Sequence, residues 1–198
     1  MPQLSYDEIT SRPVGTEEIE YGILYGNANI VFIKVGADGS IRGYQDKYLK
    51  MAHSVHDRLG ATVICASNPY IEHGHVEADQ ELICTVAAEC GFADYEVYFA
   101  GASDGGYHNL LLAQQVPQSV KLLGINASLV DEDGFVEKLE KIPNVKKILV
   151  YGTEDDDYEF VPTLQALECE NLEIITVEGA DHEFTDMVNE FIALIDLI

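Results

Sequence analysis

A serine, a run of acids and a histidine occur in that order along this chain of 198 residues, each in a short segment that contains glycine. Ser103 lies within Gly-Ala-Ser-Asp-Gly at residues 101–105, an acidic run comes after Gly152, and His182 lies three residues after Gly179. A serine hydroxyl is a weak nucleophile at neutral pH until an imidazole removes its proton, and a carboxylate must orient that imidazole. The three segments therefore contain the groups needed for acyl transfer through a serine.

The residues around Ser103 have the pattern of a sharp turn between a strand and a helix. Residues 96–100 form a short apolar run typical of a buried strand, and residues 107–115 have the pattern of a helix. Side chains two positions before and after the serine would collide with backbone in such a turn, and both positions are glycine. The helix would direct free N–H groups, including that of Asp104, at any oxyanion formed there. The alternative is a glycine-rich turn with an incidental serine, and the acid and histidine segments further along the chain decide between the two.

The rest of the chain alternates between expected strands and helices. The expected strands are residues 19–25, 30–35, 61–66, 96–100, 120–126, 146–151 and 172–177. The expected helices are residues 44–59, 79–90, 107–115, 134–141, 159–167 and 185–197. Strands this apolar, separated by helices, predict an α/β fold: a three-layer α/β/α sandwich with a mainly parallel central sheet. The turn signal at residues 26–29 indicates that the first two strands form a hairpin or meander entering the sheet.

The expected sheet places the chemically active segments at one edge. Ligands of such sheets bind beyond the carboxyl ends of the strands. Ser103, the acidic run after Gly152 and His182 each come after such an end, as does the glycine loop at residues 36–40. With 198 residues, of which 47% are hydrophobic, the chain is expected to form one domain over residues 1–198, with residues 1–16 as a polar surface arm.

The formal net charge of −24 narrows the range of partners. A field of this sign repels nucleic acids and anionic membrane surfaces, and it weighs against highly anionic substrates such as acyl-CoA. The basic residues between positions 34 and 58, which include Lys34 and Lys47, are expected to be solvated. No apolar run approaches the roughly 20 residues that span a bilayer, and the polar start lacks the features of a signal peptide, so a cytoplasmic location is expected.

The order and local patterns of these motifs resemble the α/β-hydrolase superfamily, over nearly the whole chain from about residue 19. The matching motifs are the nucleophile elbow at residues 101–105, Gly-x-x-Asp at 152–155 and Gly-x-x-His-x-Phe at 179–184. The resemblance implies that Ser103 is the nucleophile, His182 the general base and acid, and Asp155 the orienting carboxylate. Asp131, which follows the preceding expected strand, is the alternative acid, because some relatives place the acid there. The resemblance also implies that the backbone N–H groups of Ala37 and Asp104 form the oxyanion hole.

Two features depart from that family pattern. Many members carry His-Gly at the oxyanion loop, whereas Val35 and Gly36 stand here, before Ala-Asp-Gly at residues 37–39. Asp38, Asp104 and the acids at residues 154–157 also put negative charge near a site that must stabilise an oxyanion. A noncatalytic binding domain that has kept the fold is therefore an alternative to a hydrolase.

The resemblance predicts a small serine esterase without a cap domain, because residues 120–147 have room for one short helix. Its substrate is expected to be a small or medium carboxylic ester in an open site, with a thioesterase or acyltransferase as the alternative enzyme. No cofactor or metal is implied, and the oligomeric state is not indicated. The pair His73 and His75 has metal-binding spacing but lacks a third ligand, and His108 is expected to pack on the elbow helix. Four further residues near strand ends could line the acyl pocket: Tyr70, Ile71, Tyr107 and Leu129.

Overall fold

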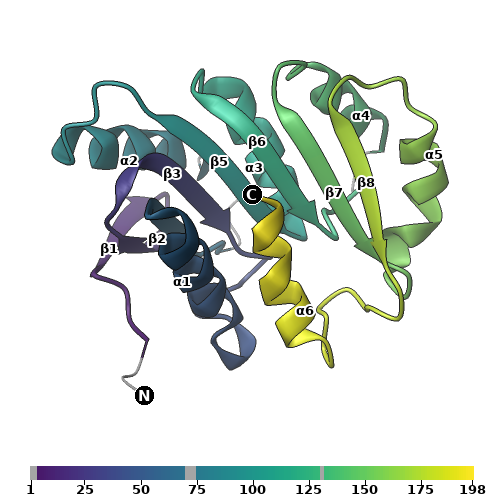
Figure 1. Cartoon of the computed structure of the whole chain (residues 1–198), viewed down its shortest axis with the longest axis horizontal. Coiled ribbons are helices and arrows are strands. Elements are labelled where there is room, and N and C mark those ends of the chain that lie inside the picture. Colours follow the sequence, from purple (N-terminus) through teal and green to yellow (C-terminus); the bar gives the residue numbers. More distant parts are fainter. Residues whose placement is uncertain (1–3, 70–74, 130–131) are drawn as a thin grey trace.

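The computed structural model describes residues 4–69, 75–129 and 132–198, and its strands form one sheet (Figure 1). The strands are β1 (Glu8–Val14), β2 (Glu17–Leu24), β3 (Asn27–Lys34), β4 (Ala61–Ala66), β5 (Glu96–Ala102), β6 (Ser119–Ile125), β7 (Lys146–Gly152) and β8 (Leu172–Val177). Their order across the sheet is β1-β2-β4-β3-β5-β6-β7-β8. All neighbours from β4 to β8 are parallel, and the pairs β1–β2 and β2–β4 are antiparallel. The prediction of a mainly parallel sheet is confirmed.

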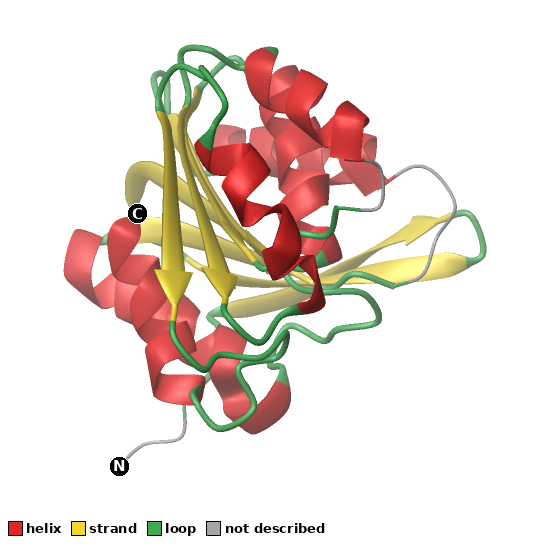
Figure 2. Cartoon of the chain, turned by 90° about the vertical axis from the view of Figure 1, so that its right-hand side faces the viewer, coloured by secondary structure: helices red, strands yellow, loops and turns green. Residues whose placement is uncertain are grey.

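Helices cover both faces of this sheet (Figure 2). They are α1 (Lys47–Leu59), α2 (His75–Glu89), α3 (Asp104–Gln115), α4 (Glu132–Glu140), α5 (Val161–Gln165) and α6 (Val188–Ala193), with 3-10 turns η1 (Tyr44–Asp46), η2 (Asp156–Phe160) and η3 (Leu194–Leu197). Side chains alternate between the faces along each strand. Val31 and Ile33 pack in the apolar layer under α1 and α6, whereas Phe32 packs in the layer under α2 to α5. The predicted three-layer α/β/α sandwich is therefore present.

The first strands differ from the expectation. Residues 8–14, expected to belong to a surface arm, form the edge strand β1, which makes a hairpin with β2 through Gly15 at φ 62°. An edge strand has one open side, so polar residues and a proline are tolerated there. The expected pairing of β2 with β3 is wrong, because β4 lies between them. Gly26 marks a close approach instead of a hairpin turn, since a side chain there would run into the backbone of Gly60 and Ala61.

Two lysines expected in solvent are buried. Lys34 is fully buried at the end of β3, and its Nζ lies 2.9 Å from Oδ2 of Asp79 on α2. Lys47, at the start of α1, donates from Nζ to the backbone carbonyl (3.2 Å) and the carboxylate (3.1 Å) of Glu183. Buried lysines occur almost only with such partners, so both mark points where distant segments are joined.

No helix within the described residues has the length and apolar character needed to cross a membrane. Between β6 and β7, the described residues contain one helix, α4.

Candidate active site

Ser103 occupies the turn between β5 and α3 in a rare backbone conformation, with φ 53° and ψ −129°. A side chain at position 101 would collide with the backbone of Gly105, and one at position 105 would collide with the carbonyls at the end of β3. Both glycines are thus required by close packing of backbone on backbone. The Ser103 N–H donates to the carbonyl of Ile125 (2.9 Å), and the Ser103 carbonyl accepts from the N–H of Ser128 (3.2 Å). The turn expected from the sequence is present and is tied to the neighbouring strand β6.

His182 and Asp155 complete a chain of hydrogen bonds from Ser103. Nε2 of His182 lies 2.9 Å from Oγ of Ser103, and Nδ1 lies 2.6 Å from Oδ2 of Asp155. The Asp155 side chain is fully buried, whereas the His182 side chain is 41% exposed. The carboxylate favours the tautomer with the proton on Nδ1, which leaves Nε2 free to accept the serine proton. The geometry is that required for a serine nucleophile with a histidine base.

Asp155 is distinguished from the acids next to it by where its oxygens point. Its Oδ1 accepts from the N–H of Asp157 (2.7 Å), which fixes the carboxylate at the start of η2, and its Oδ2 faces the imidazole. Glu154 and Asp156 are exposed, and Oδ2 of Asp157 lies 3.4 Å from the N–H of Leu129. Asp131, the other carboxylate after a strand end, lies outside the described residues.

Asn126, which no sequence motif singles out, joins the loops that carry the acid and the histidine. Its Nδ2 donates to the carbonyls of Asp181 (3.1 Å) and His182 (3.0 Å), and its Oδ1 accepts from the N–H of Gly152 (2.8 Å). Asn126 has φ 43°, a conformation that asparagine tolerates better than most residues. A lone asparagine after a strand is a weak signal, since only the fold brings its three partners together.

The candidate oxyanion loop lies beside Ser103. A side chain carbon added to Gly36 would be 3.4 Å from Cβ of Ser103, so the loop backbone passes directly by the serine. The loop is held by hydrogen bonds from the N–H of Asp38 to the carbonyl of Asn68 (2.8 Å) and from the N–H of Asn68 to the carbonyl of Gly39 (3.2 Å). Within the described part of the chain, neither the N–H of Ala37 nor that of Asp104 has an acceptor. These are the two donors expected from the sequence, and both are available.

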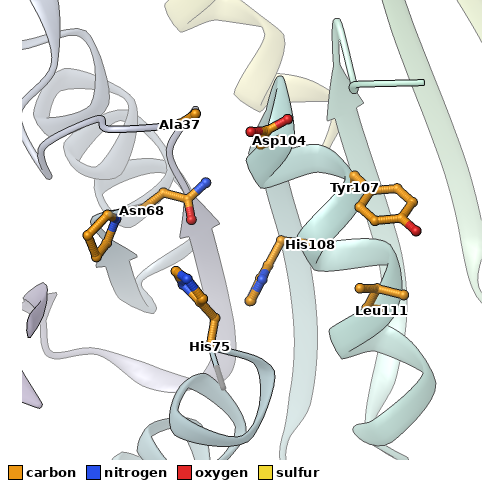
Figure 3. Close-up of a pocket in the computed structure, with 8 residues that line it drawn as sticks. Ala37, Asn68, His75, Asp104, Tyr107, His108 and Leu111 are labelled. Atoms are coloured by element: carbon orange, nitrogen blue, oxygen red, sulfur yellow. The ribbon is translucent and has the colours of Figure 1, made fainter. Parts of the chain in front are cut away.

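Two cavities adjoin this site. The first, about 110 Å³, contains Ser103 and His182 together with the apolar side chains of Tyr48 and Phe191. The second, about 220 Å³, lies along α3 and includes Ala37, Asp104 and Tyr107 among its lining residues (Figure 3).

The expected pocket residues are distributed unevenly over these cavities. Tyr107 lines the second cavity. Leu129 lines neither cavity. It follows β6 and is buried in the apolar layer under α2 to α5. Tyr70, Ile71 and His73 lie outside the described residues. His108 lies on α3 and is nearly buried.

The described residues contain no group of three or more histidine, cysteine or acidic side chains placed to hold a metal ion.

Activity that depends on His182 should fall as the pH is lowered. The hydrogen bond that His182 donates to Asp155 raises the pKa of His182 above its ordinary value, partial burial opposes this, and the charges of Asp155, Glu183 and Asp157 add to the increase. Since only neutral imidazole accepts the serine proton, turnover should be lost with decreasing pH, at a midpoint above the reference value of about 6.5. The measurement is kcat/KM for an ester between pH 5 and pH 9, with a solvent isotope effect to show that proton transfer is rate-limiting. A profile that is flat, or a midpoint below 6.5, would contradict the role of His182.

Comparison with known proteins defines the fold. No protein-family model matches the sequence, and a search of curated proteins also finds no match. Solved structures match over nearly their whole length. Est1E from Butyrivibrio proteoclasticus is 12% identical, with 96% of each chain covered and a TM-score of 0.68. A putative α/β hydrolase from Agrobacterium tumefaciens is 15% identical, with 96% of this chain and 94% of that chain covered and a TM-score of 0.73.

A serine hydrolase homologue from Coxiella burnetii is also similar, at 16% identity, with 98% of this chain and 97% of that chain covered and a TM-score of 0.68. This chain has the α/β-hydrolase fold. In an α/β-hydrolase fold, the elbow after a central strand, the acid turn and the histidine loop all lie at the carboxyl edge of the sheet. In this chain Ser103 follows β5, Asp155 follows β7 and His182 follows β8, so all three lie at the carboxyl edge of the sheet.

Proposed function

We propose that this protein is a serine hydrolase that cleaves small or medium carboxylic esters through an acyl-enzyme on Ser103. The observation that carries the proposal is the continuous chain from Oγ of Ser103 through His182 to the buried carboxylate of Asp155, with distances of 2.9 and 2.6 Å. The N–H groups of Ala37 and Asp104 lie beside the serine and have no acceptor among the described residues. Their availability as oxyanion donors also supports the proposal. The fold is shared with proteins named as esterases and serine hydrolases, which is in keeping with this function.

The reaction would proceed in two steps. Oγ of Ser103 attacks the carbonyl carbon while Nε2 of His182 takes the hydroxyl proton, and the N–H groups of Ala37 and Asp104 bind the resulting oxyanion. When the bond to the alcohol breaks, His182 delivers that proton to the leaving oxygen, and an ester of Ser103 remains. Water then attacks this ester as His182 removes its proton, and His182 returns that proton to Oγ of Ser103 when the bond to the acyl group breaks, which releases the acid and restores the serine.

The positions of three acids near the site are compatible with the formation of an oxyanion. Asp38 is exposed, and Asp155 is engaged by His182 and by the N–H of Asp157. Asp104 contributes its backbone to the oxyanion hole while its carboxylate lines the second cavity. The net charge of −24 disfavours coenzyme A thioesters, so esters without a highly anionic group are the better substrates.

Hydrolysis of p-nitrophenyl esters with acyl chains of two to ten carbons would test this function. We expect turnover well above the rate of free imidazole, with a preference for short or medium chains, since both cavities beside Ser103 are small. Absence of turnover for every ester would favour the alternative of a noncatalytic binding domain. Faster turnover of the matching acyl-CoA thioesters would favour a thioesterase.

A further inference from the structure

The second cavity beside Ser103 contains polar groups that the proposed reaction does not use (Figure 3). It is about 220 Å³ in volume and lies between the end of β4, the start of α2 and one side of α3. Asn68 and His108 line it, together with Leu111 from the next turn of α3. Ligand pockets typically combine apolar walls with a few such polar groups, which fix the orientation of the bound molecule.

The position of this cavity fits the acyl half of a substrate. Ala37 and Asp104, which offer the oxyanion N–H groups, both line it, and Ala37 also lines the cavity that contains Ser103 and His182. The leaving alcohol must lie near His182, because it receives its proton from Nε2. The acyl group then extends past the oxyanion donors, away from His182, and the second cavity lies on that side.

Asn68 presents an amide that no other described residue satisfies. The residue is only 8% exposed, and its backbone is held by hydrogen bonds with Asp38 and Gly39. The side chain points from the end of β4 toward α3 and into the cavity (Figure 3). The amide is accessible from the cavity and makes no hydrogen bond to another described side chain, so a ligand atom in the cavity can pair with it.

His108 offers a complementary acceptor. Its Nε2 lies 2.8 Å from Oδ2 of Asp79, and the same carboxylate binds Nζ of Lys34 (2.9 Å) and the hydroxyl of Tyr21 (2.7 Å). The carboxylate favours the tautomer with the proton on Nε2, and Nδ1 is then an acceptor. Burial lowers the pKa of His108 against the opposing effect of Asp79, and this direction favours the neutral ring. A hydroxyl can donate to one such group and accept from the other.

The carboxylate in the cavity wall disfavours anionic ligands. The carboxylate of Asp104 lines the cavity, and a second carboxylate brought beside it would be repelled. The Lys34 charge is buried and paired with Asp79, so it offers an anion no direct contact. Leu111 and the ring of Tyr107 supply apolar surface for the carbon part of a ligand.

From this arrangement we propose that the second cavity binds an acyl group bearing an uncharged hydroxyl, which accepts from the Asn68 amide and donates to Nδ1 of His108. The proposal rests on the proposed hydrolase function and narrows its substrates to esters of hydroxylated carboxylic acids.

Matched esters test this selectivity. One pair is methyl 3-phenylpropanoate and methyl 3-(4-hydroxyphenyl)propanoate, and the other is methyl hexanoate and methyl 6-hydroxyhexanoate. We expect kcat/KM to favour the hydroxylated member of at least one pair by about tenfold, as for loss of one hydrogen bond to a buried group. Asn68→Ala should bring that ratio close to one, because the plain ester makes no hydrogen bond to the amide. Gln115→Ala, an exposed change at the far end of α3, should keep the wild-type ratio.

Two results would overturn the proposal: a ratio near one for both pairs in the wild-type protein, or a preference that persists in Asn68→Ala. Asn68→Ser, which also loses the amide, serves if the alanine variant does not fold.

Calorimetric binding of the same esters to Ser103→Ala separates this proposal from the hydrolase function. If Ser103→Ala binds the hydroxylated ester more tightly but the wild-type protein turns over neither ester, only the hydrolase function is contradicted. Turnover without a hydroxyl preference would contradict the cavity assignment alone, and the absence of both would contradict both.

Discussion

Replacing Ser103 by alanine should abolish ester hydrolysis and leave the fold intact. In serine proteases, loss of the nucleophile lowers turnover by a factor on the order of 10⁶, because the three groups act as a unit. The substitution removes one hydroxyl that contacts Nε2 of His182 (2.9 Å) and Oγ of Ser128 (3.3 Å), so little stability depends on it. The measurement is kcat/KM on the best p-nitrophenyl ester, with the thermal melting curve recorded on the same sample.

Ser128→Ala is the matched control for this prediction. It removes the other hydroxyl in the contact with Ser103 and leaves its backbone bond to the Ser103 carbonyl, so turnover should stay within about tenfold of the wild type. Retained turnover in Ser103→Ala would mean that another group is the nucleophile. A large loss in Ser128→Ala alone would shift that role to Ser128.

Replacing Asp155 by asparagine should lower turnover by at least a hundredfold. The fully buried carboxylate holds the proton on Nδ1 of His182 at a distance of 2.6 Å, and an amide at this position allows the wrong tautomer. The equivalent change in a serine protease costs a factor on the order of 10⁴. Steady-state kinetics on one ester, compared at a pH where the wild-type rate no longer changes, would measure the loss.

Asp157→Asn and Asp131→Asn are the controls for the acid. Asp157 lies two residues beyond Asp155, but its carboxylate is near the N–H of Leu129, so turnover should stay within about tenfold of the wild type. The same result is expected for Asp131→Asn. If Asp131→Asn caused the large loss and Asp155→Asn did not, the acid would be misassigned, although the roles of Ser103 and His182 would stand.

The site motifs could be read from the sequence because the turn at Ser103 requires particular residue types at fixed spacings. Gly101 is required by contact with the backbone of Gly105 and Gly106, and Gly105 by contact with the backbone at the end of β3, so the two glycines leave a recognisable pattern around the serine. Parallel strands then bring the residues after β5, β7 and β8 to one edge, so the spatial meeting of the three groups is a consequence of chain order.

The features that the sequence did not reveal depend on partners that are distant in the chain. Lys34 has the pattern of a solvated residue because Asp79, its partner on α2, lies 45 residues away, and nothing local indicates that the two meet. Asn126 makes its bonds to residues that are 26 and 55 or more positions away. The place of β4 between β2 and β3 is likewise decided by pairing across the sheet, whereas the local turn signal at Gly26 suggested a hairpin.

Labelling with a fluorophosphonate probe tests the central claim most directly, because only an activated serine reacts rapidly with it. The folded protein should acquire one adduct, which peptide mass spectrometry should locate at Ser103. Labelling should disappear in Ser103→Ala, and heat-denatured protein should remain unlabelled. An absence of labelling in the folded wild-type protein, or an adduct at another residue, would contradict the assignment of Ser103 as an activated nucleophile.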